Sequence, residues 1–251
     1  MSKQLKSQDS TRYYLQTDLW RLLGAGMMIV GVVWFYFGFS SASYYVPTVI
    51  TPVGLILFLI FSGRHVSDRD IEEEMEHRLT DYDKPVTDRA DYSRVILKQP
   101  ADVETEAYHM GKEAAFFKKN KPGRTVSDVY VKTHVFFTNH ALLICARQLR
   151  MSLARDAAGA AEDFEWALSY EDLVSAQLCE NVTAVALSNT KKQITVKWYE
   201  LVLSGEEGEI LRLPVNNDMD MSDLCDHVNR KIQQQKKEEL SKKPKKVMLT
   251  Y

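Results

Sequence analysis

Histidine and cysteine are the residues whose chemistry could most directly define an active site or a metal centre. The chain of 251 residues contains six histidines and three cysteines, but none forms an HExxH, HxxxH or CxxC spacing, and no phosphate-binding glycine loop or nucleophile elbow is present. His134 and His140 flank a predicted turn, so a metal site there is an open alternative. Cys145, Cys179 and Cys225 have apolar neighbours, which favours buried free thiols in a reducing compartment. We therefore expect no enzyme activity, no metal and no cofactor.

A group of cations forms the best candidate binding site. Lys118, Lys119, Lys121 and Arg124 lie close together in the sequence, and Lys132 follows them. Their side chains could bind an anionic group such as a phosphate. The alternative is that they form the solvated end of a helix, where positive charge complements the helix dipole. The net charge of the chain is only -2, whereas nucleic-acid-binding domains are strongly basic.

Two apolar segments near the N-terminus, 22–39 and 44–62, contain no charged residue. As a helix, the first would extend over about 27 Å, close to the thickness of the hydrocarbon core of a bilayer. The link at 40–43 is so short that two spanning helices must be antiparallel. Pro47 and Pro52 predict an irregular start to the second helix, so a re-entrant or interfacial segment is the alternative to a second span. A cleaved signal peptide is the alternative for the first segment.

The distribution of positive charge predicts how this hairpin is oriented. Lys and Arg residues precede the first apolar segment and follow the second, whereas the link contains none. The positive-inside rule then assigns both flanks to the cytoplasm. We expect an integral protein of the plasma membrane with two spans and with both termini in the cytoplasm.

Helices and a linker are expected directly after the hairpin. Ser67 and Asp70 resemble a capping box, and a narrow apolar stripe with an acidic, solvated opposite face predicts a helix from there. Residues 85–100 are expected to be an extended linker. Apolar residues spaced three or four apart predict an amphipathic helix over 102–119, and a strand over 114–118 is the alternative.

From Thr125 onward the apolar residues alternate with period two, which is typical of strands. Two strands are predicted at 129–137 and 141–146, and a loop of small and polar residues at 154–162. A helix with one apolar stripe is predicted from about Asp220. The remaining predicted strands are 164–169, 172–179, 182–188, 192–203 and 209–215.

This order of about seven strands and one final helix resembles a PH/GRAM-type domain. The resemblance lies in the segments VYVKTHVFFTNHALLICA, FEWALSYEDLVSAQL, QITVKWYELVL, EILRLPV and DLCDHVNRKIQQQ. Together with the hairpin, it is similar to small bacterial membrane proteins with a PH-like cytoplasmic domain, including the YcxB-like group. The resemblance implies a PH-like antiparallel β-barrel that is closed at one end by the helix, and it is more specific for fold than for function.

The resemblance also gives the cations an expected role, because PH domains bind phosphoinositide headgroups with basic residues around their first hairpin. It therefore implies headgroup binding by the five cations named above, although Lys121–Arg124 departs from the usual pattern. The expected organisation is a cytoplasmic N-terminus at 1–18, a transmembrane hairpin at 19–63, juxtamembrane helices and linker at 64–124, a PH-like domain at 125–240 and a basic tail at 241–251.

Two functions fit these features, of which the first is the prediction and the second is the alternative. The first is a membrane-anchored interaction or scaffold protein that presents its PH-like domain to a protein partner or to a second copy. The second is a sensor of anionic lipid that uses the basic residues and the basic tail, although that tail could equally be disordered. Both functions require the bilayer, and neither involves nucleic acid.

Overall fold

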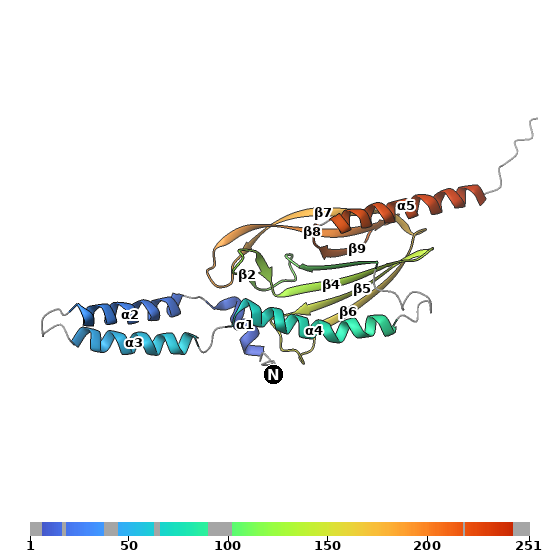
Figure 1. Ribbon diagram of the computed structural model, residues 1–251. Helices are drawn as coiled ribbons and strands as arrows, with labels where there is room; N and C mark the ends of the chain where they lie inside the picture. Colours follow the sequence, from blue (N-terminus) through green and yellow to red (C-terminus); the bar gives the residue numbers. More distant parts are fainter. Residues whose placement is uncertain are drawn as a thin grey trace, which may run out of the picture.

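Figure 1 shows the computed structural model as a helical hairpin that projects from one end of an α+β domain. The structure describes residues 7–16, 19–37, 45–62, 66–89, 102–217 and 219–242. The predicted link at 40–43, most of the basic tail and most of the predicted linker lie outside these residues. The elements are α1 (Ser7–Leu15), α2 (Leu19–Tyr36), α3 (Tyr45–Ser62), α4 (Asp68–Arg89), β1 (Val103–Tyr108), β2 (Phe117–Lys119), β3 (Thr125–Ser127), β4 (Val129–Phe137), β5 (Ala141–Arg150), β6 (Ala161–Ser169), β7 (Leu173–Ala186), β8 (Gln193–Gly205), β9 (Gly208–Val215) and α5 (Met219–Lys242).

Helices α2 and α3 pack against each other in opposite directions (Figure 1). Small residues permit this close approach: a Cβ atom on Gly24 would lie 2.7 Å from the backbone nitrogen of Phe58 and 2.9 Å from the carbonyl oxygen of Gly54. Thr51 occupies the space beside Gly31 in the same way. Small residues at the contact are typical of helix pairs in membranes. The outward faces of both helices expose large apolar side chains.

Of the described helices, α2 alone has the length and apolar composition that are needed to cross a bilayer, and a signal sequence near an N-terminus has the same properties. The apolar segment Pro47–Ser62 of α3 falls short of this length. The irregular start predicted for the second helix is not found, because α3 runs from Tyr45 through Pro52. Pro47 lies in its first turn, where a missing backbone N–H is tolerated.

Helix α1, which was not predicted, packs onto the α+β domain. Its Tyr13 and Tyr14 side chains are buried together with side chains of α4 and of the sheets. We call this cluster the junction core, because it includes the residues on both flanks of the α2–α3 hairpin. Its members are Tyr13, Tyr14, Val66, Ile71, Leu79, Val126, Tyr130, Leu149 and Met151.

Helix α4 begins with the predicted capping box. Asp70 Oδ2 accepts hydrogen bonds from the backbone N–H and the hydroxyl of Ser67, both at 2.7 Å, and the N–H of Asp70 donates to Ser67 Oγ at 3.2 Å. The expectation of an entirely solvated acidic face was wrong, because Glu74 is 7% exposed. It accepts a hydrogen bond from Arg78 Nε at 2.9 Å. Arg78 in turn donates to the carbonyl of Leu153 at 3.1 Å, which joins α4 to the domain.

The strands form three antiparallel sheets that are not closed into a barrel. A four-stranded sheet has the order β1-β4-β5-β6, a three-stranded sheet has the order β7-β8-β9, and β2 and β3 form a small hairpin. The expectation of a closed barrel of about seven strands is therefore not met, because β6 and β7 end the two larger sheets and are not hydrogen-bonded to each other in the described part of the chain. The α+β class with antiparallel sheets is confirmed.

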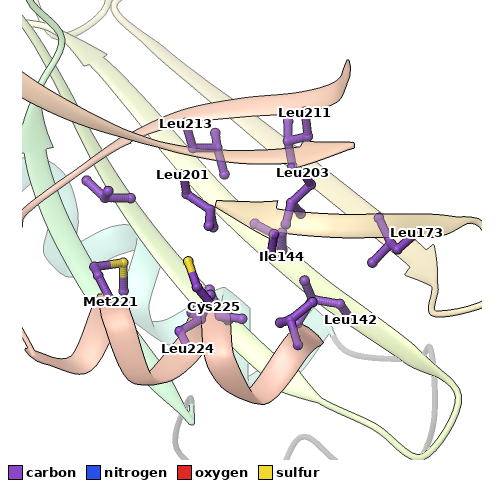
Figure 2. Packing of buried hydrophobic residues seen from close by; sticks show 14 of the residues in the cluster. Leu142, Ile144, Leu173, Leu201, Leu203, Leu211, Leu213, Met221, Leu224 and Cys225 are labelled. Carbon is purple, nitrogen blue, oxygen red and sulfur yellow. The ribbon is translucent and has the colours of Figure 1, made fainter. Parts of the chain in front are cut away.

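The alternation that predicted β4 reflects a strand buried on both faces. Val131 and Val135 belong to the main core, the cluster of buried side chains between the two larger sheets and α5, whereas Tyr130 belongs to the junction core. The stripe predicted for the last helix is also confirmed, because α5 covers the main core with Met221, Leu224, Cys225, Val228 and Ile232. Figure 2 shows the α5 side chains directed toward Leu142 and Ile144 of β5 and Leu201 and Leu203 of β8.

The predicted helix over 102–119 is wrong. Val103–Tyr108 is strand β1, whose Val103 pairs with Val135 of β4, and Phe117–Lys119 is β2. The alternative of a strand over 114–118 was therefore correct only for its last residues. In VETEAY the two glutamates are exposed and Thr105 and Ala107 are buried, so the segment also satisfies period two. The linker expected from residue 85 is wrong as far as residue 89, because α4 continues to Arg89.

Candidate functional site

The β2–β3 hairpin carries four of the five cations that the sequence singled out. Its turn is held by the N–H of Gly123, which donates to the carbonyl of Asn120 at 2.9 Å, and by the N–H of Arg124, which donates to Asn120 Oδ1 at 2.9 Å. Gly123 has a φ of 84°, a conformation that favours glycine. Lys119 and Arg124 lie on either side of this turn, and both are exposed.

A groove of about 430 Å³ lies between this hairpin and the start of β8. Three cations line it: Lys119 and Arg124, which the sequence had singled out, and Lys197, which it had not. The hydroxyl-bearing residues Thr125 and Thr195 are also in its wall. Together these groups supply hydrogen-bond donors and positive charge, the combination that binds a phosphate or carboxylate group. The remaining lining residues are Met110, Gly123, Ile194 and Val196.

The three cations of the groove differ in their surroundings. Lys197 Nζ lies 2.8 Å from Glu180 Oε1, and Tyr199 donates to the same carboxylate at 3.0 Å. Hydrogen bonding to Glu180 raises the pKa of Lys197, and hydrogen bonds from Lys197 and Tyr199 lower the pKa of Glu180. No described carboxylate forms an ion pair with Lys119 or Arg124. These two side chains are therefore the cations of the groove that can take an external anion without giving up a partner in the described chain.

The groove lies at the end of the domain that faces the α2–α3 hairpin. In Figure 1, β2 and the turn between β7 and β8 are on the hairpin side of the domain, and the C-terminal end of α5 projects in the opposite direction. The β7–β8 turn adds two exposed lysines, Lys191 and Lys192, at this end. Lys191 has a φ of 57°, so the turn is tight. The hairpin-facing end of the domain therefore exposes a group of cations beside the acidic first turn of α4.

The other candidate cations have different roles. Lys118 Nζ lies 3.8 Å above the ring of Tyr13, a cation–π contact. Lys121 is exposed, but its backbone N–H donates to Asp68 Oδ2 at 2.7 Å. Lys132 is 8% exposed on β4 and lies 3.5 Å from Glu106. The structure thus brings together Lys119 and Arg124 of the predicted set and separates Lys132 from them.

The carboxylate of Asp68 joins the β2–β3 hairpin to the base of the α2–α3 hairpin. Besides the N–H of Lys121, it accepts a hydrogen bond from the hydroxyl of Tyr13 at 2.8 Å. Burial and the Asp68 contact raise the pKa of Tyr13 well above its usual value, so its hydroxyl stays protonated and donates. Tyr14 donates to the carbonyl of Ser127, the last residue of β3, at 3.0 Å. Helix α1 is therefore bonded directly to the end of β3 and, through Asp68, to the β2–β3 turn.

The two flanks of the α2–α3 hairpin are also bonded to each other. The side-chain amide of Gln16, just before α2, donates to the carbonyl of Val66, just after α3, and accepts from the N–H of Val66 at 3.1 Å. This pair of bonds resembles one step of a β-ladder and fixes the separation of the hairpin ends. Trp20 and Phe61 stack at the same end of the hairpin, with ring centroids 6.0 Å apart.

Histidine and cysteine do not assemble into a metal centre in the described part of the chain. His134 lies on β4 with Nδ1 3.4 Å from Glu104, whereas His140 is exposed in the turn before β5. The three cysteines are free thiols as expected, but only Cys225 is buried.

Sequence reasoning missed two parts of this site. Lys197 is 73 positions from Arg124 along the chain, and only the packing of β8 beside the β2–β3 hairpin brings them to one groove. The alternation of Gln193–Gly205 predicted a strand but not its neighbours. Tyr13 and Tyr14 lie in a short polar stretch, and the adjacent pair of tyrosines was the one available signal of burial. Comparison with protein-family models, with curated proteins and with solved structures gave no match.

Proposed function

We propose that this protein is anchored in a membrane by the α2–α3 hairpin, and that its soluble domain binds anionic lipid headgroups at the membrane surface through the Lys119–Arg124–Lys197 groove. The observation that carries this proposal is the position of the groove at the hairpin-facing end of the domain. In the described chain Lys119 and Arg124 have no carboxylate partner, so binding an anion breaks no existing ion pair.

We further propose that the hairpin crosses the bilayer twice, with both flanks on the cytoplasmic side. The support is that Gln16 and Val66 are bonded to each other and that both flanks belong to the junction core. A chain whose two flanks pack on one domain must leave and return on the same side. The order of a four-stranded sheet, a three-stranded sheet and a final helix supports the PH-like relationship that the sequence resembles.

The energetic argument depends on distance from the membrane. A cation near an anionic leaflet gains about 1 kcal/mol, and the gain decays over a Debye length of about 8 Å. The hydrogen bonds between Gln16 and Val66 and the junction core keep the groove end of the domain beside the bilayer. The cations of the groove then remain within this range. Individually weak contacts at Lys119, Arg124 and the β7–β8 turn then add up, because the hairpin has already removed the cost of bringing the domain to the surface.

Acetylation of lysines in lipid nanodiscs tests the proposal. The full chain is needed, because a soluble fragment would lose the α1 and α4 part of the junction core. We expect anionic lipid to slow acetylation of Lys119 on the order of tenfold relative to zwitterionic lipid, and high salt to reverse the effect. Lys237, exposed on the far part of α5, is the internal control and should react equally in both lipids. Equal protection of Lys119 in both lipids would overturn the proposal.

A protein partner is the second candidate function. The observation that favours it is strand β6, which ends its sheet and has mostly exposed side chains. Its Phe164 ring is 36% exposed and stacks on Trp166 at 5.6 Å. The edge of β7, by contrast, is occupied at Ala176, whose N–H and C=O both bond to the side-chain amide of Asn229 at 2.9 Å. Chemical cross-linking in native membranes that maps to β6 would support this second function, and cross-links confined to other elements would count against it.

A further inference from the structure

We infer that docking of helix α1 and occupancy of the basic groove are thermodynamically coupled through Asp68, so that anionic lipid in the groove stabilises α1 on the domain and loss of α1 weakens lipid binding. This inference rests on the proposed function of the groove. The two sites are distinct: the groove lies between β2–β3 and β8, and the α1 seat lies in the junction core.

The first step is the connection itself. Asp68 Oδ2 accepts the N–H of Lys121 at 2.7 Å, and Asp68 Oδ1 accepts the hydroxyl of Tyr13 at 2.8 Å. Lys121 lies in the turn between Lys119 and Arg124, both of which line the groove. One carboxylate therefore holds the groove turn with one oxygen and α1 with the other. Lys118, on the neighbouring strand β2, adds the contact of its ammonium group with the ring of Tyr13 at 3.8 Å.

The second step concerns the stability of α1 on the domain. It is nine residues long, and helices of this length are marginal in water without packing partners. Among its described side chains, Tyr13 and Tyr14 are buried in the junction core, and the hydroxyl of Thr11 donates to the carbonyl of Ser152 at 2.9 Å. A docked and a released state of α1 are thus the two states whose populations a bound anion can change.

The third step is the direction of the coupling. With α1 docked, Asp68 holds the turn at Lys121 in the position that brings Lys119 and Arg124 to one groove. With α1 released, Asp68 loses the Tyr13 hydroxyl and the turn loses the Lys118–Tyr13 contact, so the groove is less well ordered. An anion that prefers the ordered groove must favour the docked state, and linkage requires that α1 release lowers its affinity by the same factor.

Hydrogen exchange of the full chain in nanodiscs tests the coupling, with zwitterionic lipid or phosphatidylglycerol-containing lipid as the probe. In the wild type we expect anionic lipid to slow exchange both in the β2–β3 turn and in residues 11–15 of α1, the latter on the order of fivefold. Tyr13→Phe removes the hydroxyl bonded to Asp68 and keeps the ring. We expect this variant to lose the lipid dependence at α1 and to retain it, weakened, at the turn.

Tyr14→Phe is the matched control, because it removes a buried hydroxyl from the same helix but one that bonds to Ser127 rather than to Asp68. It should speed exchange of α1 in both lipids and preserve the lipid dependence. Lipid protection at the turn without any at α1 would overturn the coupling and leave the proposed function intact. Protection of α1 that persists in Tyr13→Phe would overturn the Asp68 route. Absence of lipid protection at both places would overturn the proposed function together with the coupling.

Discussion

Replacing Arg78 by Met is predicted to destabilise the attachment of α4 to the domain strongly. Arg78 and Glu74 form a salt bridge at 2.9 Å, and their side chains are only 2% and 7% exposed. Arg78 also donates to the carbonyls of Leu153 at 3.1 Å and Arg150 at 3.5 Å. Methionine fills similar space but leaves the Glu74 carboxylate buried without its cation and the carbonyl of Leu153 without this donor.

Removing one partner of a buried ion pair costs about 3–5 kcal/mol, because the remaining charge is not compensated. In a chain of this size, each kcal/mol lowers the midpoint of thermal unfolding by about 2–4 °C. We therefore expect Arg78→Met to lower the midpoint of the soluble domain by about 10 °C in detergent micelles, measured by circular dichroism at strand wavelengths. The double variant Glu74→Met/Arg78→Met should recover part of this loss, because apolar replacement of both partners removes the buried charge.

The same helix contains a matched control. Arg69 and Glu73 have the same i,i+4 spacing and a separation of 2.8 Å, but their side chains are 83% and 51% exposed. Arg69→Met should cost no more than about 0.5 kcal/mol. Equal shifts for Arg69→Met and Arg78→Met would refute the reasoning, as would a double variant that is less stable than Arg78→Met alone.

Three further outcomes are expected. Gly24→Val should force α2 and α3 apart and cost about 1–3 kcal/mol of stability. Gly26→Val should be tolerated, because nothing lies within 4 Å of its Cβ position. Thermal unfolding in micelles compares the two variants, and equal losses of stability would contradict this packing. Burial, then nearby Asp226 and Cys179, raises the pKa of Cys225 to about 11. Maleimide at neutral pH should therefore label the partly exposed Cys145 and Cys179 before Cys225, as read by mass spectrometry, and prior labelling of Cys225 would contradict its burial. Burial lowers the pKa of His109, so the stability that the neutral imidazole contributes should be lost as pH falls below about 6.5. His109→Phe should therefore flatten the dependence of the unfolding midpoint on pH. An unchanged slope would show that another group causes the pH dependence.

The strands were predictable where one pattern dominated the sequence. Alternation identified β4 and β8, and turn residues correctly separated β8 from β9. The two strands predicted at 172–179 and 182–188 were wrong, because they are one continuous strand, β7, that pairs with β8 along its length. The apolar stripe on α5 was equally predictable, because its apolar residues recur at helical spacing over several turns. These elements bury one regular set of side chains, so their local pattern and their tertiary environment agree.

Residues 103–119 were misread because two periods fit the same apolar residues. Val103, Ala107 and Met110 have helical spacing, and Val103, Thr105 and Ala107 also alternate. The segment is a strand because β1 pairs with β4, from Val103 opposite Val135 to Tyr108 opposite Tyr130. That pairing is non-local, and neither propensity nor spacing within the segment could reveal it.

The candidate site was predictable only in part, because it too depends on contacts between residues far apart in the sequence. Lys119 and Arg124 were found because they are neighbours in sequence, whereas Lys197 joins them through tertiary packing alone. The contacts at the base of the hairpin join Gln16 and Tyr13, which precede α2, to Val66 and Asp68, which follow α3. Polar contacts of this kind leave no periodic signal in the sequence.

The central claim is that the basic end of the domain lies at the lipid surface. The most direct test incorporates a fluorescent amino acid at position 121 or at position 237 of the full chain, in nanodiscs with nitroxide-labelled lipid headgroups. We predict strong quenching at 121, in the groove turn beside the hairpin, and little at 237, on the part of α5 that projects away from it (Figure 1). Equal quenching at the two positions, or stronger quenching at 237, would contradict the claim.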